Sequence, residues 1–363
     1  MKFALGYQLA GDGETFFSDA VREFREHIAE IYFPWMDTAT CRASITEQRG
    51  FVNWNAQNIL ESDLSAYKDM GIKLDILFNA NCYGEEALSL KLANRIVSIF
   101  EHLRNSVGGV EIATTTSPAI AHIIKDRFPD VEVRASVNMR IGTVKGMQYL
   151  SDLFDSFHVQ REYNRDLKKI AELRDWADKN GKKLVMLANS GCMSFCSGQT
   201  FHDNLVAHEN HLDDFHNIKW NPHVCWKYLE KKENWVSLLQ NTWIRPEDIG
   251  NYEKYFDVVK LATRMHSRPW IVIKAYVERK YNGNILDICE PGFGPAIAPC
   301  VIDNSKFPED WFQRTTACSG NCESCTYCTS VLEKVLVDLN TGKPWKTAVS
   351  QDAGNAGKRK NRK

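Results

Sequence analysis

Short apolar runs alternate with longer segments of helical periodicity along most of the chain. The apolar runs lie at residues 2–7, 31–35, 73–81, 109–117, 131–138, 154–160, 183–189 and 256–264. Helical patterns lie at residues 14–30, 58–71, 85–106, 118–128, 143–153, 165–181 and 269–281. Such alternation is typical of a parallel sheet with crossover helices. Eight strand candidates, each followed by a helix or a long insertion, favour an α/β fold of the (β/α)8 TIM-barrel type.

A doubly wound sheet is the alternative fold, but the first apolar run lacks the Gly-x-Gly-x-x-Gly turn of a dinucleotide site. Polar residues follow six of the strand candidates. They lie at residues 79–84, 114–117, 136–140, 160–165, 189–192 and 263–264. Strand ends require polar loops in any case. In a barrel, however, all these loops lie on the C-terminal face, where the active sites of this fold are found.

The composition is that of an ordinary globular protein, with 363 residues, 44% hydrophobic and 25% charged, and a formal net charge of −1. No global field therefore draws the chain to nucleic acid or membrane. We expect a barrel at 1–300 with an insertion at about 190–255, a cysteine-rich extension at 301–345, and a disordered basic tail at 346–363. The tail ends in GKRKNRK, which leaves RNA open as a partner.

The N-terminus lacks the apolar region and cleavage site of a signal peptide, and no stretch has the length of a membrane span. We therefore expect no membrane partner and a cytoplasmic location, where thiols stay reduced. Eleven cysteines in such a protein favour metal or cluster ligation over disulfides.

Two of these cysteines, Cys192 and Cys196, directly follow the strand candidate at 183–189. The insertion after them carries Cys225, and Cys41 follows the second strand candidate, so that all four would rise to the same face. Thiolates that converge there suit an iron–sulfur cluster. A structural zinc site or simple packing remains open as an alternative.

A second group of four cysteines lies within eleven residues, spaced C-x3-C-x2-C-x2-C: Cys318, Cys322, Cys325 and Cys328. This spacing resembles the runs that wrap a [4Fe–4S] cluster, although the usual following proline is missing. Zinc is again the alternative. Cys82, Cys289 and Cys300 have no ligand spacing and are expected to be small buried hydrophobes.

The motifs of common hydrolases are missing. Neither His-Glu-x-x-His nor Gly-x-Ser-x-Gly occurs anywhere in the sequence. Of the ten histidines, His202 follows the turn with Cys192 and Cys196 most closely. It is therefore the preferred candidate for proton transfer.

Two stretches, 187–208 and 243–264, resemble the collagenase-like peptidase family, number thirty-two among peptidases of unknown catalytic type. The second stretch contains Trp-Ile-Arg-Pro-Glu-Asp and ends in Lys-Leu-x-x-Arg. The family pattern usually reads Lys-x-x-Gly-Arg. Thr263 replaces its glycine before Arg264, so a different turn is expected there. The segment TCRAS matches a family loop with an arginine, here Arg42.

The resemblance implies a TIM-type barrel and, in several branches of the family, a [4Fe–4S] cluster held by four cysteines. Those branches hydroxylate the ubiquinone ring, or pyrimidines in RNA, with prephenate rather than dioxygen as the oxygen donor. Cys192, Cys196 and Cys225 fall where such a cluster would lie, and Cys41 matches a ligand position of one branch. The C-terminal cysteine group is not general to the family and implies a second cluster.

The leading hypothesis is an iron–sulfur enzyme for oxygen-independent hydroxylation, or a related redox modification, of a small molecule, nucleotide or peptide. In this hypothesis Arg264 and Arg42 clamp the carboxylate of the donor, Arg140 helps, and His202 moves a proton. A redox partner or a homologous subunit is an expected partner. The alternatives are a metal-dependent peptidase, with zinc on His202, His208 and Asp203, or a non-catalytic, cluster-bearing subunit of a heterodimer.

Overall fold

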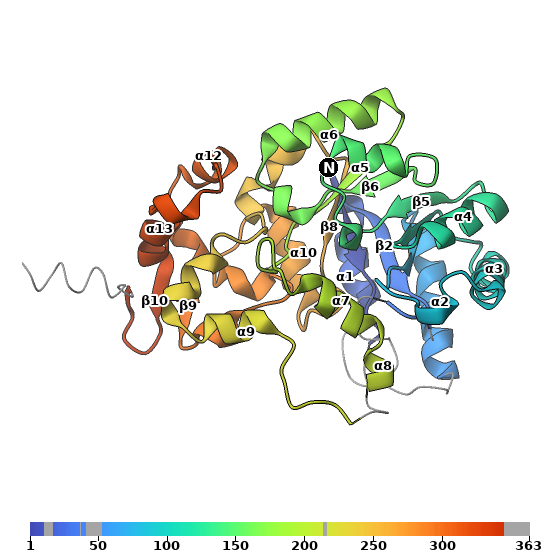
Figure 1. The fold of residues 1–363 in the computed structure, drawn as a ribbon, viewed down its shortest axis with the longest axis horizontal. Coiled ribbons are helices and arrows are strands. Elements are labelled where there is room, and N and C mark those ends of the chain that lie inside the picture. The colour runs from blue at the N-terminus through green and yellow to red at the C-terminus, as the bar shows by residue number, and fades with distance from the viewer. Residues whose placement is uncertain (11–16, 37, 41–52, 213–215, 345–363) are drawn as a thin grey trace, which may run out of the picture.

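The computed structural model describes residues 1–10, 17–36, 38–40, 53–212 and 216–344 (Figure 1). Eight parallel strands hydrogen-bond in sequence order, and β8 closes on β1, so the sheet forms a barrel. The strands are β1 Lys2–Gly6, β2 Ile28–Pro34, β3 Lys73–Phe78, β4 Ile112–Thr115, β5 Glu132–Ala135, β6 Ser156–His158, β7 Lys183–Leu187 and β8 Val258–Leu261. The predicted (β/α)8 fold is thereby confirmed.

Crossover helices surround the barrel. They are α1 Phe17–Glu23, α2 Trp54–Asp69, α3 Leu90–Ser106, α4 Pro118–Arg127, α5 Val144–Tyr149, α6 Leu167–Lys179 and α10 Pro269–Glu278. Polar side chains cap several helix starts: Ser89, Ser117 and Asp166 accept hydrogen bonds from backbone N–H groups of the first turns of α3, α4 and α6. Pro118 begins α4, as predicted.

Short 3-10 helices complete the loops. They are η1 Arg25–His27, η2 Gly84–Glu86, η3 Val137–Met139, η4 Arg161–Tyr163, η5 Lys232–Leu238, η6 Pro246–Tyr252, η7 Ile285–Ile288, η8 Asn304–Lys306 and η9 Cys322–Ser324.

The helix predicted over residues 14–30 is wrong at its C-terminal end. Helix α1 ends at Glu23, and residues from Ile28 onward form β2. Strand β2 is hydrogen-bonded to β1 on one side and to β3 on the other, so closure of the barrel overrides the local helical pattern. Residues 11–16 lie outside the described part of the chain.

The insertion after β7 contains α7 Gln199–Ala207, α8 Glu209–Leu212 and α9 Val224–Leu229. The C-terminal extension contains α11 Gly294–Ile297, α12 Trp311–Thr316, α13 Tyr327–Val335 and an antiparallel sheet of β9 Cys300–Ile302, β10 Leu336–Asp338 and β11 Lys343–Pro344. Figure 1 shows this extension against one side of the barrel, with α9 below it and α7 in front of the strands.

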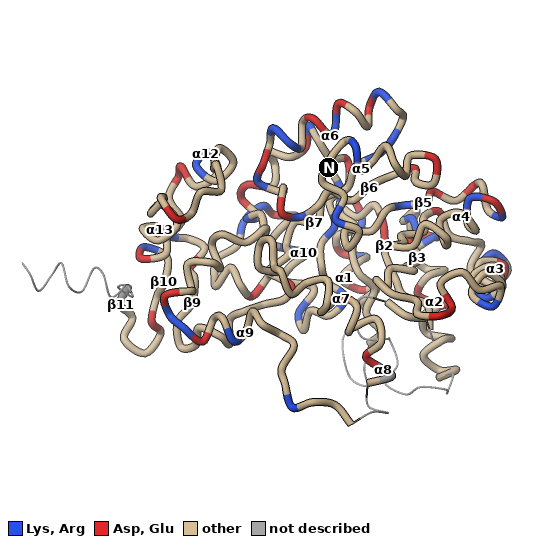
Figure 2. Tube along the Cα trace, viewed as in Figure 1, with Lys and Arg blue, Asp and Glu red and all other residues tan. Residues whose placement is uncertain are grey.

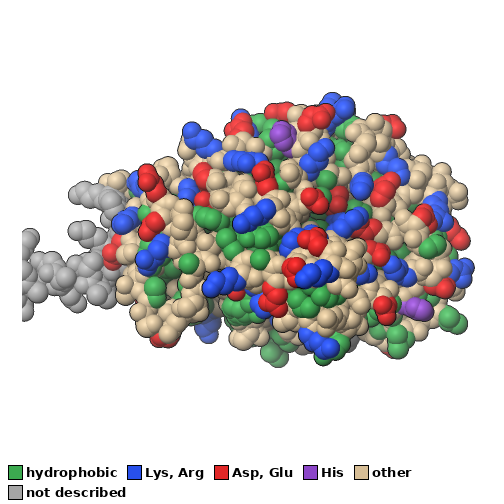
Figure 3. All heavy atoms as spheres, turned by 90° about the horizontal axis from the view of Figure 1, so that it is seen from above, with side chains coloured by type: hydrophobic (Ala, Val, Ile, Leu, Met, Phe, Trp, Pro, Cys, Tyr) green, Lys and Arg blue, Asp and Glu red, His purple; other side chains and the backbone are tan. Residues whose placement is uncertain are grey.

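Acidic and basic residues alternate on the outer helices, as Figure 2 shows for α6. Lys169 pairs there with Glu172 and Arg174 with Asp178. Both signs are also interspersed over the face drawn in Figure 3. Within the described ranges, no helix combines the length and apolarity that a membrane crossing demands.

The three cysteines predicted to be small buried hydrophobes differ. Cys289 and Cys300 are buried in the core, which confirms the prediction for both. Cys82 is partly exposed instead, because it lies in the loop after β3, where its Sγ accepts a hydrogen bond from the Gly84 N–H.

Candidate functional site

The turn that follows β7 is fixed to its neighbours by the side chain of Asn189. Its Oδ1 accepts from the Ala262 N–H at 2.6 Å, and its Nδ2 donates to the carbonyls of Ala262 and Ile288 at 3.0 and 2.9 Å. The Gly191 N–H donates to the Glu290 carbonyl at 3.0 Å. The segment that delivers Cys192 is therefore held by the end of β8 and by residues 288–290.

Asn241 and Thr242, which lie in the insertion before β8, also bind this turn. Asn241 Nδ2 donates to the Gly191 carbonyl at 2.7 Å, and Thr242 Oγ1 donates to the Ser190 carbonyl at 3.2 Å. A Cβ on Gly191 would lie 2.1 Å from the Pro291 carbonyl oxygen, so only glycine fits this close approach. The backbone before Cys192 is thus a rigid support.

Cys192, Cys196 and Cys225 come together at this end of the barrel, from the loop after β7 and from α9. A Cβ on Gly198 would lie 3.8 Å from Cys196 Sγ and 3.0 Å from a methyl group of Val224, the neighbour of Cys225. Burial raises the pKa of the Cys225 thiol, and the Cys192 and Cys196 thiolates raise that pKa further. Cys192 and Cys196 are therefore close enough to Cys225 for their charges to affect it.

The side chains at this place are of the type that an iron–sulfur cluster takes as ligands. Three partly exposed cysteines lie in this region, and cluster irons take cysteine thiolates as ligands. Among the described residues, no three His, Cys, Asp or Glu side chains form a ready-made site for a single metal ion. Cys41 and Arg42 lie outside the described residues.

His202 lies against the start of the helix that carries Cys225. Its ring, on α7, meets the ring of His223 edge-on at 4.7 Å between centroids, and His223 is the N-cap residue of the helix that carries Cys225. His208 lies elsewhere, since its Cε1 is 3.7 Å from the position of a Cβ on Gly84. The structure thus brings the preferred proton-transfer residue against His223, two residues before Cys225.

Helix α7 is docked on the barrel through Asp203. Asp203 Oδ2 accepts from Asn81 Nδ2 at 3.3 Å and lies 3.4 Å from Arg140 Nη2. Arg140 Nη1 also donates to Thr200 Oγ1 at 3.2 Å, and Arg140 itself has a left-handed φ of 53°. Arg140, expected to help bind the donor, is therefore engaged with α7.

Arg264 follows β8, at the same end of the barrel as the turn after β7. Its Nη2 lies 3.4 Å from Thr40 Oγ1, so the segment that leads to Cys41 and Arg42 begins beside it. Thr263 Oγ1 accepts from the Gly6 N–H at 2.7 Å and donates to the Gly6 carbonyl at 3.2 Å. The threonine that replaces the family glycine thus ties β8 to β1.

The barrel interior holds charged side chains that the sequence analysis missed. Arg134 on β5 forms a bidentate pair with Glu30 on β2, at 2.6 and 2.9 Å, and donates to Glu132 at 2.8 Å. TIM-barrel interiors are usually filled by branched apolar side chains. A signal existed in the sequence: Glu30 is a charge among apolar residues of β2, and Glu132 and Arg134 alternate with apolar residues in β5.

Asp75, His158 and Lys260 lie near this ion pair. Burial raises the pKa of Asp75 to about 6, against the opposing effect of Arg134. Burial holds the pKa of His158 well below its usual value, and Lys260 and Arg134 lower it further, so the ring is neutral. The ammonium of Lys260 lies 3.7 Å from the centroid of the Tyr32 ring.

The second predicted cysteine group lies in the loop before α13 and at the start of that helix. Cys318, Cys322 and Cys325 are exposed, and Cys328 is partly buried at the start of α13. Burial raises the pKa of Cys328 to about 11; Arg165 opposes this, and the other three thiols raise it. The Gly320 N–H donates to Cys318 Sγ at 3.3 Å, which curls the loop back on itself.

Comparison with known proteins gives one informative relative. No protein-family model matches the chain. An uncharacterized protease of Methanocaldococcus jannaschii is 24% identical over 289 residues, 76% of this chain and 81% of that protein.

Among solved structures, a U32 peptidase has 16% identity and a TM-score of 0.48, covering 71% of this chain and 91% of its own. A glycoside hydrolase family 5 mannosidase from Rhizomucor miehei has 12% identity and a TM-score of 0.41, covering 71% and 80%. Over about three quarters of its length, this chain is thus similar to an archaeal protein named as a protease. This similarity supports the resemblance to a peptidase family, without the iron–sulfur branch.

Proposed function

We propose that this protein is an iron–sulfur enzyme of the collagenase-like peptidase family that carries out oxygen-independent hydroxylation or a related redox modification. The observation that carries the proposal is the convergence of Cys192, Cys196 and Cys225 at the mouth of the barrel. They come from two separate segments of the insertion after β7, and the charges of the first two affect the third. Cys41 is proposed as the fourth ligand, because Thr40 lies against Arg264 at the same mouth.

A cluster at this position would supply a Lewis-acidic iron or a single electron when bound. The chain itself would bind and orient the reactants. Arg264 and Arg42 are proposed to hold a carboxylate of the oxygen donor, such as prephenate, because a guanidinium binds carboxylates with paired hydrogen bonds. His202 is proposed to move the proton, since its ring lies against that of His223, two residues before Cys225.

Helix α7 would cover the reaction site. The anchoring of Asp203 to Asn81 and Arg140 holds α7, with His202 on it, over the loops after β3 and β5. Exclusion of water strengthens the electrostatic interactions of bound charges and prevents side reactions. We propose a cytoplasmic protein with a redox partner and a substrate that is a small molecule, a nucleotide or a peptide. The basic residues 357–363, outside the described part, keep RNA among the candidates.

Metal and sulfide analysis of anaerobically purified protein tests this proposal. If both cysteine groups hold [4Fe–4S] clusters, the intact chain should carry about eight irons with equal sulfide. Cys192→Ala or Cys196→Ala should each leave about four, because the ligands of a cluster act as a unit. Cys82→Ala is the matched control, a partly exposed cysteine outside both groups, and should keep all the iron. An unchanged iron content in Cys192→Ala and Cys196→Ala would exclude a cluster at these two cysteines.

A metal-dependent peptidase is the second candidate; the name of the archaeal relative, a protease, supports the peptidase activity but not its dependence on a metal. This function would require an open metal site with a general base nearby. Purified protein with zinc and no sulfide, which cleaves peptides and loses that activity to a chelator, would establish the peptidase in place of the redox enzyme.

A further inference from the structure

Arg161 lies on η4, the short helix after β6 at the C-terminal end of the barrel. Two loops of the same end pack on this helix through Tyr163. A Cβ on Gly142, in the loop after β5, would lie 2.4 Å from the Tyr163 ring. On the other side, the Tyr163 ring meets Phe195 edge-on at 6.2 Å between centroids, and Phe195 directly precedes Cys196. The helix that carries Arg161 is therefore packed against the loop that carries Cys196.

The end of η4 is tied to the turn before Cys192. Asn164, the C-cap residue of η4, is buried, and its Nδ2 donates to the carbonyls of Leu187 and Thr242 at 2.7 and 3.0 Å. Leu187 ends β7, and Thr242 Oγ1 donates to the Ser190 carbonyl within that turn. The same backbone thus positions both Arg161 and the first of the rim cysteines.

The guanidinium of Arg161 is buried without the acceptors that a buried cation requires. Its side chain is only 7% exposed, and it donates no hydrogen bond within the described part of the chain. Among the same residues, Glu162 is its ion partner, but Arg161 Nε lies 3.9 Å from Glu162 Oε1, which is too far for a hydrogen bond. Arg161 therefore keeps its N–H groups available.

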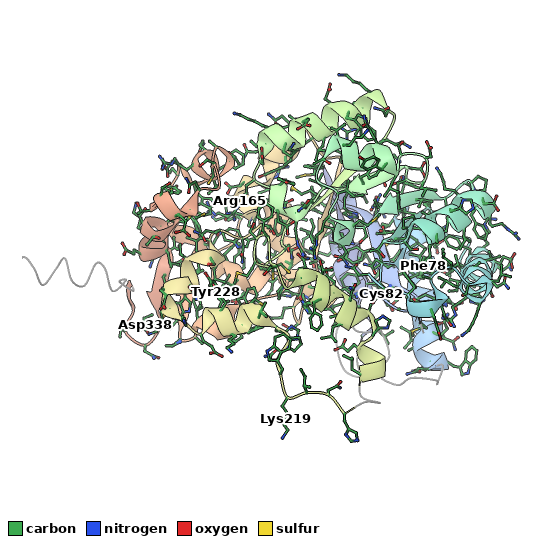
Figure 4. All side chains as sticks on the ribbon, viewed as in Figure 1. Phe78, Cys82, Arg165, Lys219, Tyr228 and Asp338 are labelled. Atoms are coloured by element: carbon green, nitrogen blue, oxygen red, sulfur yellow. The ribbon has the colours of Figure 1, made fainter. Side chains whose placement is uncertain are left out.

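Other arginines with little exposure use their donors. Arg134, which is also buried, donates to two carboxylates and a hydroxyl group. Even the partly buried Arg165, labelled in Figure 4 close to α6, donates to two backbone carbonyls. Burial of polar N–H groups without acceptors is costly, so a fold retains such a group where something else compensates it. For Arg161, the missing acceptor is expected on a bound molecule.

Glu162 has unused hydrogen-bonding capacity as well. Its side chain is 2% exposed, and within the described ranges no donor reaches its Oε2. A cation and a carboxylate that lie this close, each with unmet hydrogen bonds, are complementary to a molecule that carries a carboxylate beside a donor group. A guanidinium binds a carboxylate through two parallel hydrogen bonds, and a carboxylate oxygen accepts from a hydroxyl or ammonium group.

We propose that Arg161 and Glu162 form the binding site for a small carboxylic acid whose neighbouring carbon carries a hydroxyl or an ammonium group. Arg161 binds the carboxylate of this acid, and Glu162 Oε2 accepts from its hydroxyl or ammonium group. The inference deepens the proposed function by naming a class of molecule that binds at this end of the barrel. It rests on the proposed function only for the statement that this molecule reacts there.

Three acids of equal size test the site by isothermal titration calorimetry with the anaerobically purified full chain. Propionate, lactate and alanine share a carboxylate and differ in the group on the neighbouring carbon: hydrogen, hydroxyl or ammonium. Dissociation constants of about 1 mM suit ligands this small. We expect lactate or alanine to bind about tenfold more tightly than propionate, because only they satisfy Glu162. The tighter of the two identifies the donor group.

Variants of the two residues separate their roles. Arg161→Gln should weaken the binding of all three acids about tenfold or more, because an amide cannot replace the charged fork. Glu162→Met keeps the length of the side chain without its acceptor, and should reduce the affinities for lactate and alanine to that for propionate. Arg174→Gln is the matched control, since Arg174 on α6 pairs with Asp178 and donates to a backbone carbonyl. It should bind the acids as the unaltered chain does.

The stability of Arg161→Met distinguishes a binding role from a structural one. Because Arg161 donates no hydrogen bond within the described residues, an apolar side chain of similar length should leave the urea midpoint unchanged or raise it. A structural role would lower this midpoint and leave the affinity for the acids unchanged. That result would overturn the inference even if Arg161→Gln does not fold.

Two results of the calorimetry would also overturn the inference. One is an unaltered chain that binds none of the three acids, and the other is equal binding by Arg161→Gln and Arg174→Gln. Equal affinities of the unaltered chain for all three acids would remove Glu162 from the site. Failure of the proposed function looks different. Cys192→Ala would then keep as much iron as the unaltered chain, while the affinities for the three acids and their dependence on Arg161 would remain.

Discussion

Gly191 has no room for a side chain, and it directly precedes Cys192. We expect Gly191→Ala to destabilise the protein by about 1–3 kcal/mol, the usual cost of forcing atoms into a packed site. The added Cβ would lie 2.1 Å from a backbone oxygen, which cannot swing away as a flexible side chain would. Because the turn carries Cys192, the same variant should also lose the iron that Cys192, Cys196 and Cys225 are proposed to bind. Urea unfolding and iron analysis measure the two effects.

Gly294→Ala is the control for this expectation. Its Cβ would meet its nearest atom at 3.4 Å, an ordinary contact, at the start of α11 in the segment that follows Pro291. The free energy of unfolding of this variant should lie within about 0.5 kcal/mol of that of the unaltered chain. Equal stabilities and equal iron contents for the two alanine variants would mean that the turn at Gly191 adapts to a side chain. The turn would then not be a rigid support for Cys192 and Cys196.

Helix α7 depends on one carboxylate for its attachment to the barrel. Asp203→Ala removes the partner of both Asn81 and Arg140, and the side chain of Asp203 is only 7% exposed. Charged hydrogen bonds that are shielded from water contribute about 1.5–3 kcal/mol. We therefore expect α7 to detach more often, so that a protease cuts the segment at 190–255 faster in Asp203→Ala than in the unaltered chain.

A double-mutant cycle with Arg140→Gln should show that this effect is local to the pair. The two substitutions together should cost less than the sum of the single ones, since each removes the same interaction. Asp175→Ala is the matched control, because Asp175 pairs with Lys179 on the exposed face of α6 and such pairs contribute little. Full additivity, or faster cleavage in the control, would contradict a docking role for Asp203.

The elements themselves were largely predictable from the sequence. The alternation of apolar runs and helical patterns gave eight strands in the right order, and Pro118 marked the start of α4. The boundary between α1 and β2 was not predictable, because hydrogen bonds to β1 and β3 decide it after the barrel closes. Cysteine spacing singled out two cysteine groups as candidate ligands, which stays a prediction. The sequence could not single out Arg161, whose burial arises only from tertiary packing.

The whole molecule combines a conventional outer core with an interior of paired charges. Around the barrel, large apolar side chains pack between the sheet and the helices, as in the stacked pair Phe100 and Phe128 at 4.7 Å between centroids. Inside it, the bidentate pair of Arg134 and Glu30 spans from β5 to β2. Paired interior charges link the closure of the barrel to ionisation, so the stability of the whole fold should depend on pH.

Asp75 makes this dependence measurable. Burial raises its pKa from an ordinary value of 3.8 to about 6 in the folded chain, so folding favours the protonated carboxyl. The resulting stabilisation is fully present below pH 3.8 and is lost as the pH rises through 6. At roughly 1.4 kcal/mol per pH unit, the carboxyl therefore costs about 3 kcal/mol of stability at neutral pH relative to its protonated form. Asp75→Asn cannot ionise, and its amide oxygen can still accept from Thr114 Oγ1, which lies 2.8 Å from the Asp75 carboxylate.

The free energy of unfolding of Asp75→Asn, relative to the unaltered chain, should consequently increase between pH 4.5 and pH 7.5, when both are unfolded in urea at a series of pH values. Arg134 and several hydrogen bonds lower the pKa of Glu132 to about 2 despite its burial. The stability that Glu132 contributes is therefore lost as the pH falls, the opposite of the effect of Asp75. It is present in both proteins, so its contribution cancels in the comparison. Parallel curves for the two proteins would mean that the interior keeps Asp75 ionised through its neighbours, and that barrel closure is not linked to this proton.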